Sequence, residues 1–153
     1  MNTTQQQIES LLRSTGDKRI IAMLPTLAHS TFYTVGCHSH HRFRGGLAQH
    51  SLGVTQLLLS QENLVQQYGR TNVIIAGMFH DICTAKNWLT IGSGQHGRRS
   101  VRILGERFRM YLDSDVYSAI KYHMHHWHGN GGQESNPLHA ALRHADHQNA
   151  ATA

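Results

Sequence analysis

The stretch VIIAGMFHDI, residues 73–82, places a histidine and an aspartate directly after an apolar run. Such a run, preceded by the capping residue Thr71, predicts a buried helix that ends near Ile82. His80 and Asp81 would then lie at the inner end of that helix. Because an unpaired buried polar group costs several kcal/mol, both side chains need partners from other parts of the chain.

Helical periodicity continues on both sides of this stretch, and no clear strand alternation is present. Loops are expected over residues 30–44, 83–94 and 125–136. Helices are expected over residues 3–14, 19–28 (broken by Pro25), 45–67, 95–111, 113–124 and 137–149, the last one capped by Asn136 with Pro137 at its first position. We therefore predict a compact all-α fold of about five to seven helices. A length of 153 residues suits a single domain over residues 1–153, with a core of about 19–150.

The composition excludes several classes of protein. The chain carries 14 Lys+Arg, 9 Asp+Glu and 39% hydrophobic residues, which does not match a disordered tail. No apolar run approaches the roughly 18 residues of a membrane span, and the first residues do not resemble a secretory signal. Cys37 and Cys83 are too few for a disulfide framework. We expect reduced thiols and a cytoplasmic protein without a membrane partner.

The net charge of +5 and the pI near 9.6 allow a nucleic-acid partner. The surplus is modest, however, and comes from scarce acidic residues rather than from blocks of Lys and Arg. Anionic small molecules would suit such a surface equally well, so a nucleic-acid partner is not expected.

The 14 histidines are unusually many, and some fall on the inner faces of the expected helices. His50, His123 and Asp146 each lie three or four residues from an apolar residue of the same predicted face. Taken alone, either histidine is explained as a hydrogen-bonded residue of the core. His50 and Asp146 taken together with the adjacent pair His80-Asp81 favour a shared divalent metal such as Zn, Co, Mn or Fe, because imidazole and carboxylate together suit these ions.

The order His50, His80-Asp81, Asp146 resembles the H…HD…D signature of the HD-domain metal-dependent phosphohydrolases. The surrounding segments resemble the family's helices as well: GGLAQHSLGV, MFHDI, QHGRRSVRIL, AIKYHMHHW and ALRHADHQNA. The resemblance covers residues 30–150, and the layout looks most like the short phage enzymes that cleave dATP to deoxyadenosine and triphosphate. It implies the all-α HD fold, a location in the host cytoplasm for a phage protein, and a homo-oligomer such as a hexamer.

The same resemblance implies roles for individual residues. The four signature residues would ligate the metal, and His96 and His123 match positions that hold a second metal in some members. His96 alternatively acts on the phosphate as a catalytic residue. Lys86 is the other catalytic candidate, although HDICTAK displaces it from the lysine position of the family's HDIGK. An acidic residue that follows the HD pair in some nucleotidases of the superfamily is missing from this sequence.

Cationic side chains are needed to offset charge on the phosphoryl oxygens of a nucleotide. Lys86, Arg98 and Lys121 are candidates, and Arg44 precedes His50 and is expected to point into the same pocket, together with Arg42. A solvated helix face is the commoner explanation for Arg98, Arg102 and Arg109, which lie on roughly one face of the expected helix. Mg, Mn or Co is expected to enter with the substrate phosphates.

Aromatic residues give weaker signals. Phe32, Tyr33 and Trp88 would either stack on a base or pack in the core. His125, His126 and His128 surround Trp127 in a Gly-rich stretch and are expected to line a pocket rim.

The expected activity is therefore metal-dependent hydrolysis of a deoxynucleoside triphosphate, with dATP first. Two alternatives keep the same chemistry, a nucleoside monophosphate 5′-nucleotidase and a cyclic-phosphate phosphodiesterase. A third belongs to another class, a non-catalytic His-rich module that binds metal or nucleic acid.

Overall fold

The computed structural model describes residues 2–86, 88, 95–124 and 136–152. Over these ranges the chain forms α-helices and one 3-10 helix and no strand, so the all-α prediction is confirmed. The helices are α1 (Thr3–Arg13), α2 (Lys18–His29), α3 (Gly46–Leu59), α4 (Glu62–Tyr68), α5 (Arg70–Phe79), the 3-10 helix η1 (Ile82–Thr84), α6 (His96–Phe108), α7 (Ser114–Lys121) and α8 (Pro137–Ala150).

The described ranges hold eight α-helices rather than the expected five to seven, and several boundaries differ from the sequence prediction. The α6 and α7 helices each end three residues earlier than expected. The α2 helix continues through Pro25 for another turn, so proline does not break it. The expected helix over residues 45–67 is two helices, because Gln61 has extended backbone angles between α3 and α4. The α5 helix begins at Arg70, one residue before the predicted cap, after Gly69 with a φ of 84°.

Side-chain caps fix the beginnings of several helices. Asp17 accepts hydrogen bonds from the backbone N–H groups of Arg19 and Ile20 at the start of α2. Asn136 accepts one from His139 N at 2.8 Å and is followed by Pro137, as the sequence predicts. The direction of α8, which carries Asp146, is thereby set by a local signal.

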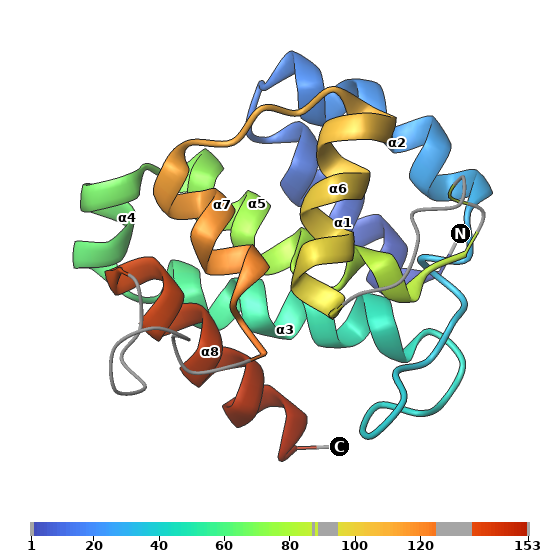
Figure 1. Ribbon diagram of the computed structural model, residues 1–153. Coiled ribbons are helices and arrows are strands. Elements are labelled where there is room, and N and C mark those ends of the chain that lie inside the picture. The colour runs from blue at the N-terminus through green and yellow to red at the C-terminus, as the bar shows by residue number, and fades with distance from the viewer. Residues whose placement is uncertain (1, 87, 89–94, 125–135, 153) are drawn as a thin grey trace.

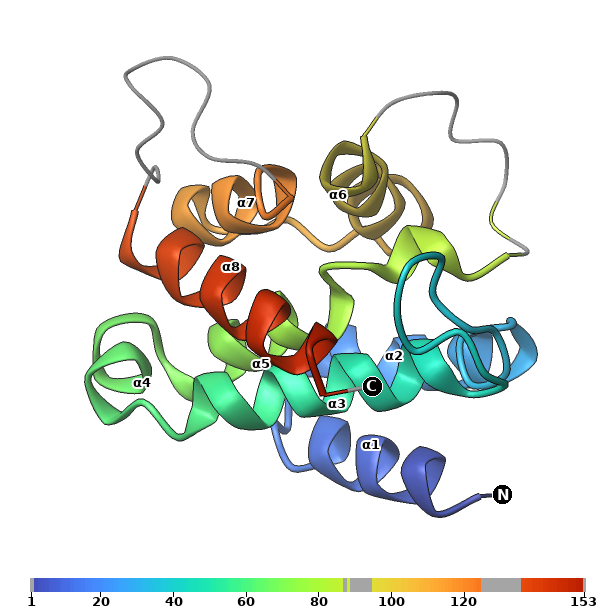
Figure 2. The same cartoon turned by 90° about the horizontal axis from the view of Figure 1, so that it is seen from below.

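The α5 helix lies in the middle of the molecule, and its residues 73–79 are all buried. It packs against α3 and α7, and α3 packs in turn against α8 (Figure 1). Seen from below, α1 lies on one side of α3, while α6 and α7 lie side by side on the opposite side (Figure 2). This arrangement brings the end of α5 next to α3 and α8, which carry the other signature residues.

None of the helices in the described part of the chain is long and apolar enough to cross a membrane.

Candidate metal centre

Four side chains from α3, the end of α5 and α8 meet inside the molecule. They are His50, His80, Asp81 and Asp146, and one ligand atom from each lies within 4.8 Å of the others. Both histidines are fully buried, while each aspartate is 7% exposed. The structure therefore brings together the four signature residues, with the carboxylates on the solvent side.

Each histidine of this group is held through its Nδ1 atom. His80 Nδ1 donates to Gly77 O at 2.8 Å, and His50 Nδ1 donates to Asn149 Oδ1 at 2.8 Å. In the neutral rings the lone pairs therefore lie on Nε2. The two Nε2 atoms are 3.3 Å apart.

These lone pairs face carboxylate oxygens. His50 Nε2 lies 2.8 Å from Asp146 Oδ1, and His80 Nε2 lies 3.3 Å from Asp81 Oδ2. Lone pairs and anionic oxygens at such distances repel one another unless a positive charge joins the group. Two imidazole nitrogens and two carboxylates, each nitrogen oriented by a hydrogen bond at its far side, fit a divalent metal ion.

The electrostatics of the group point in the same direction. Burial lowers the pKa of His80, but Asp81 and Asp146 outweigh burial and raise that pKa well above its usual value. Burial raises the pKa of Asp146, but hydrogen bonds from His50 and His80 outweigh it and lower that pKa well below the usual range. The group therefore stabilises positive charge between its members, as protons or as a cation.

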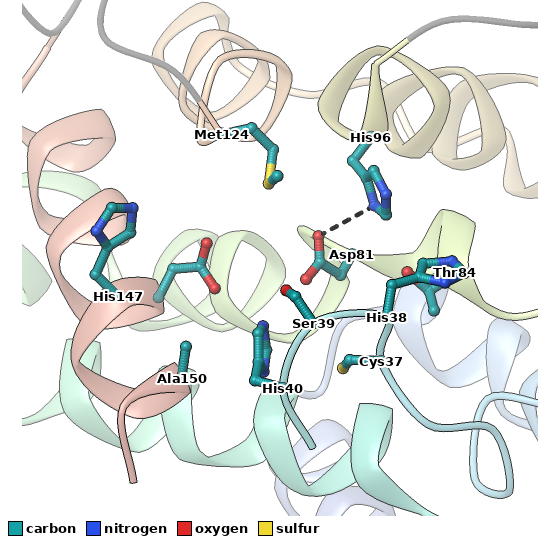
Figure 3. Close-up of a pocket in the computed structure, with 11 residues that line it drawn as sticks. Cys37, His38, Ser39, His40, Asp81, Thr84, His96, Met124, His147 and Ala150 are labelled. Carbon is teal, nitrogen blue, oxygen red and sulfur yellow. Dashed lines mark ion pairs between the residues drawn. The ribbon is translucent and has the colours of Figure 1, made fainter. Parts of the chain in front are cut away.

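His123 and His96 approach Asp81 from the other side. His123 is buried, donates from Nδ1 to Ile120 O at 2.6 Å and places Nε2 2.9 Å from Asp81 Oδ1. His96, at the start of α6, places Nδ1 3.9 Å from the same oxygen (Figure 3). Asp81 Oδ2 thus faces His50 and His80, and Asp81 Oδ1 faces His96 and His123. A second metal held by His96 and His123 stays a prediction.

A cavity of about 350 Å³ lies above the aspartates, within the usual size range of ligand sites. A loop and the end of α8 form opposite walls, with Met124 and His96 between them (Figure 3). The lining residues are Cys37, His38, Ser39, His40, Asp81, Thr84, His96, Met124, Asp146, His147 and Ala150.

The cationic residues predicted to bind substrate lie elsewhere. Lys86 is exposed, and its backbone N–H donates to Thr31 Oγ1 at 2.7 Å. Arg44 is exposed before α3, as is Arg42. Arg98 and Lys121 line a separate hollow between α6 and α7. Contact of any of these with substrate stays a prediction.

The aromatic candidates pack within the fold. Phe32 and Tyr33 are buried in the core with their rings edge-to-face. Trp88 packs edge-to-face on Phe108 and donates to Ile82 O at 3.0 Å. For these three residues, packing within the fold is therefore the interpretation that holds, and not stacking on a base. His125, His126, Trp127 and His128 lie outside the described residues.

Two features of the site were not predicted from the sequence. The loop residues His38, Ser39 and His40 form a cavity wall, and no spacing signal identifies them. Asn149, by contrast, follows Asp146 by three residues on α8, so helical spacing places both on one face.

The loop reaches the cavity because of the backbone at His41. This residue has a φ of 43°, and its carbonyl accepts a hydrogen bond from Cys37 N at 2.9 Å. The chain thus doubles back and sets the His40 ring 4.5 Å from that of His50. Atoms of His40, His41 and His50 also form a second group of nitrogen ligands.

A comparison with protein-family models matches residues 47–151 to the HD domain. The chain belongs to the HD-domain family, which confirms the resemblance seen in the sequence. Comparisons with curated proteins and with solved structures gave no match. The family and the buried His–Asp group together support a divalent metal site and a metal-dependent phosphohydrolase.

Proposed function

We propose that this protein hydrolyses a deoxynucleoside triphosphate to a deoxynucleoside and triphosphate, with dATP as the first candidate substrate. The observation that carries the proposal is the group of four ligands from three helices at the base of a ligand-sized cavity. The likeness of the sequence to the short phage dATP triphosphohydrolases supports the choice of substrate.

In this proposal His50, His80, Asp81 and Asp146 hold a divalent ion, with Zn, Co, Mn and Fe as candidates. When bound, such an ion would lower the pKa of a water ligand and polarise a phosphoryl oxygen. Gly77 O and Asn149 Oδ1 keep the two imidazoles in the tautomer that presents Nε2 to the ion.

His96 is the group best placed to move a proton. It lines the cavity beside Asp81. Burial lowers the pKa of His96, and the charge of Arg99 adds to this effect while that of Asp81 opposes it. The ring is therefore neutral at pH 7 and able to accept a proton during hydrolysis.

The phosphate charges of a substrate need neutralisation in this cavity. No Lys or Arg is among its lining residues in the described part of the chain. Hydroxyl donors are present at Ser39 and Thr84, and they carry no charge. We therefore propose that Mg, Mn or Co enters with the triphosphate.

We further propose a single domain over residues 1–153, a location in the cytoplasm and a homo-oligomer such as a hexamer. The short chain and the family resemblance support the oligomer. Light scattering during size-exclusion chromatography measures the mass of the assembly against the 17.2 kDa chain.

The test is a panel of dNTPs, NTPs, dNMPs and 2′,3′-cyclic phosphates, each assayed with Mg²⁺, Mn²⁺ and Co²⁺ and with products identified. Triphosphate released from dATP supports the proposal. Inorganic phosphate from a monophosphate would show a nucleotidase, and a ring-opened ester would show a phosphodiesterase. The double variant H80A/D81A is expected to lose turnover, and retained turnover would contradict the site.

A further inference from the structure

A second hollow, of about 210 Å³, lies between α6 and α7. It shares no lining residue with the cavity above the His–Asp group. Its lining residues are Arg98, Arg99, Val101, Arg102, Tyr117 and Lys121. Four of these six residues are cationic and none is acidic, which is a concentration of charge unlike that of the first cavity.

Most of this positive charge is not neutralised by ion pairs among the described residues. Arg102 pairs with Glu106, at 3.5 Å between Nε and Oε1. Within the described residues, Arg98, Arg99 and Lys121 form no ion pair. Arg99 Nε is in addition buried without a hydrogen-bond partner among those residues. A buried donor without a partner is energetically unfavourable, so an anionic acceptor in the hollow would remove a penalty as well as neutralise charge.

The walls of the hollow are held by close helix packing. Gly97 lets α6 approach α7 so closely that a Cβ atom at this position would overlap the carbonyl oxygens of Ile120 and Lys121. Lys121 Nζ lies 5.4 Å and 5.3 Å from the ring centroids of Tyr117 and Tyr122, which orients its ammonium group. The ammonium group of Lys121 is thus placed before any ligand arrives.

We propose that the hollow between α6 and α7 binds a phosphate-bearing small anion, at a site separate from the His–Asp cavity. Guanidinium groups match phosphate oxygens in geometry and bind them with paired hydrogen bonds. The hollow suits one or two phosphate groups rather than a polymer, because its volume is only about 210 Å³. The phosphates of a free polyphosphate and those of a nucleotide offer the same chemistry.

The test is a titration of the ¹⁵N-labelled, metal-loaded protein with inorganic pyrophosphate, followed by amide NMR shifts and by calorimetry. We expect the amide signals of Arg102 and Tyr117 to shift, because these residues lie on the facing walls of the hollow. Binding at the first cavity is reported separately, by shifts at His40 and His147. The variant R98M/K121M should bind pyrophosphate at least tenfold more weakly at the hollow. Its binding at the first cavity reports that the variant is folded.

The matched control is R107M, because Arg107 is exposed on the same helix and does not line the hollow. R107M should bind pyrophosphate at the hollow with the affinity of the wild type. A parallel titration with dAMP separates the sources of the phosphate: tighter binding of dAMP assigns the site to nucleotides, and tighter binding of pyrophosphate to free polyphosphate.

Three results would overturn the proposal. One is a pyrophosphate titration without shifts in α6 and α7, and another is equal affinity of R98M/K121M and the wild type. The third is binding of a single-stranded oligonucleotide that depends on Arg98 and Lys121 when neither small anion binds. Because these readouts do not depend on turnover, they stay separate from the test of the proposed hydrolase.

Discussion

His50 and Asn149 are joined by a hydrogen bond of 2.8 Å between Nδ1 and Oδ1. Asp146, three residues before Asn149 on α8, lies 2.8 Å from the other nitrogen of the same ring. One face of α8 therefore holds both nitrogens of a buried histidine on α3. This contact positions the ring and links the site to the packing of two helices.

Replacing Asn149 by Leu removes the acceptor for His50 Nδ1 without removing a proposed ligand. We expect metal affinity to fall by about 10–100-fold, the usual effect of losing such a supporting hydrogen bond. Competition with a chelator of known affinity measures it. N149D retains the acceptor and should bind metal nearly as the wild type does, and Q148L should do so as an exposed neighbour. Equal affinity of N149L and the wild type would show that Asn149 does not position His50.

Replacing Gly53 by Ala tests the same contact from α3. A Cβ atom there would overlap the amide nitrogen of Asn149 and lie 3.0 Å from its Cγ. We expect the Asn149 side chain to shift and metal affinity to fall, as measured by the same competition. The matched control is G105A, where a Cβ atom meets nothing within 4 Å. It should retain metal affinity and gain up to about 1 kcal/mol of stability from helix propensity.

The His–Asp group could be found from sequence because each member stands at a helical position with apolar neighbours. His80 and Asp81 end an apolar run, and Asp146 follows Leu142 by one turn. Such periodic patterns predict the folded positions well, because they determine which face of a helix is buried. Asn149 carries the same signal through its spacing from Asp146.

The cavity walls and the positions of the cationic residues could not be predicted from helical spacing. His38 and His40 face the cavity because the backbone reverses at His41, and a positive φ in a non-glycine residue has no spacing signature. Arg98 follows His96 by two residues, which on a helix turns the two side chains to different faces. Adjacency in sequence therefore does not place Arg98 in the cavity that His96 lines.

Metal removal should lower the thermal stability of the wild type. An ion held at 100 times its dissociation constant adds about 2.7 kcal/mol, which corresponds to about 5–10 °C in Tm for a chain of this size. We expect dialysis against a chelator to produce this loss, measured by calorimetry. D146N keeps the shape of the side chain but not its charge, so its Tm should respond much less. The control E62Q changes an exposed acid on α4 and should respond as the wild type does. A full response in D146N would contradict its role as a ligand.

Acidification should destabilise the fold through His41. Burial, with the nearby His50 and His40, lowers its pKa from 6.5 to about 4. The unfolded chain therefore binds a proton below pH 6.5 while the folded chain does not, so stability falls as pH drops from 6.5 toward 4. Asn tolerates the positive φ of this position, and H41N should lose less stability between pH 7 and pH 5 in urea unfolding. H29N, at an exposed histidine, should lose as much as the wild type. If H41N loses as much stability as the wild type over this pH range, groups other than His41 control the response.

The close packing of α6 on α7 predicts a large difference between two glycines of one helix. A Cβ atom at Gly97 would overlap backbone atoms of Ile120 and Lys121, and backbone in a packed helix moves only with its neighbours. We expect G97A to lower the free energy of unfolding by about 1–3 kcal/mol, as overpacking does. G105A adds the same methyl group to the same helix in open space and should raise it by up to about 1 kcal/mol. Urea unfolding at pH 7 measures both, and the opposite signs separate packing from helix propensity. Equal effects of the two substitutions would mean that α6 does not approach α7 at Gly97.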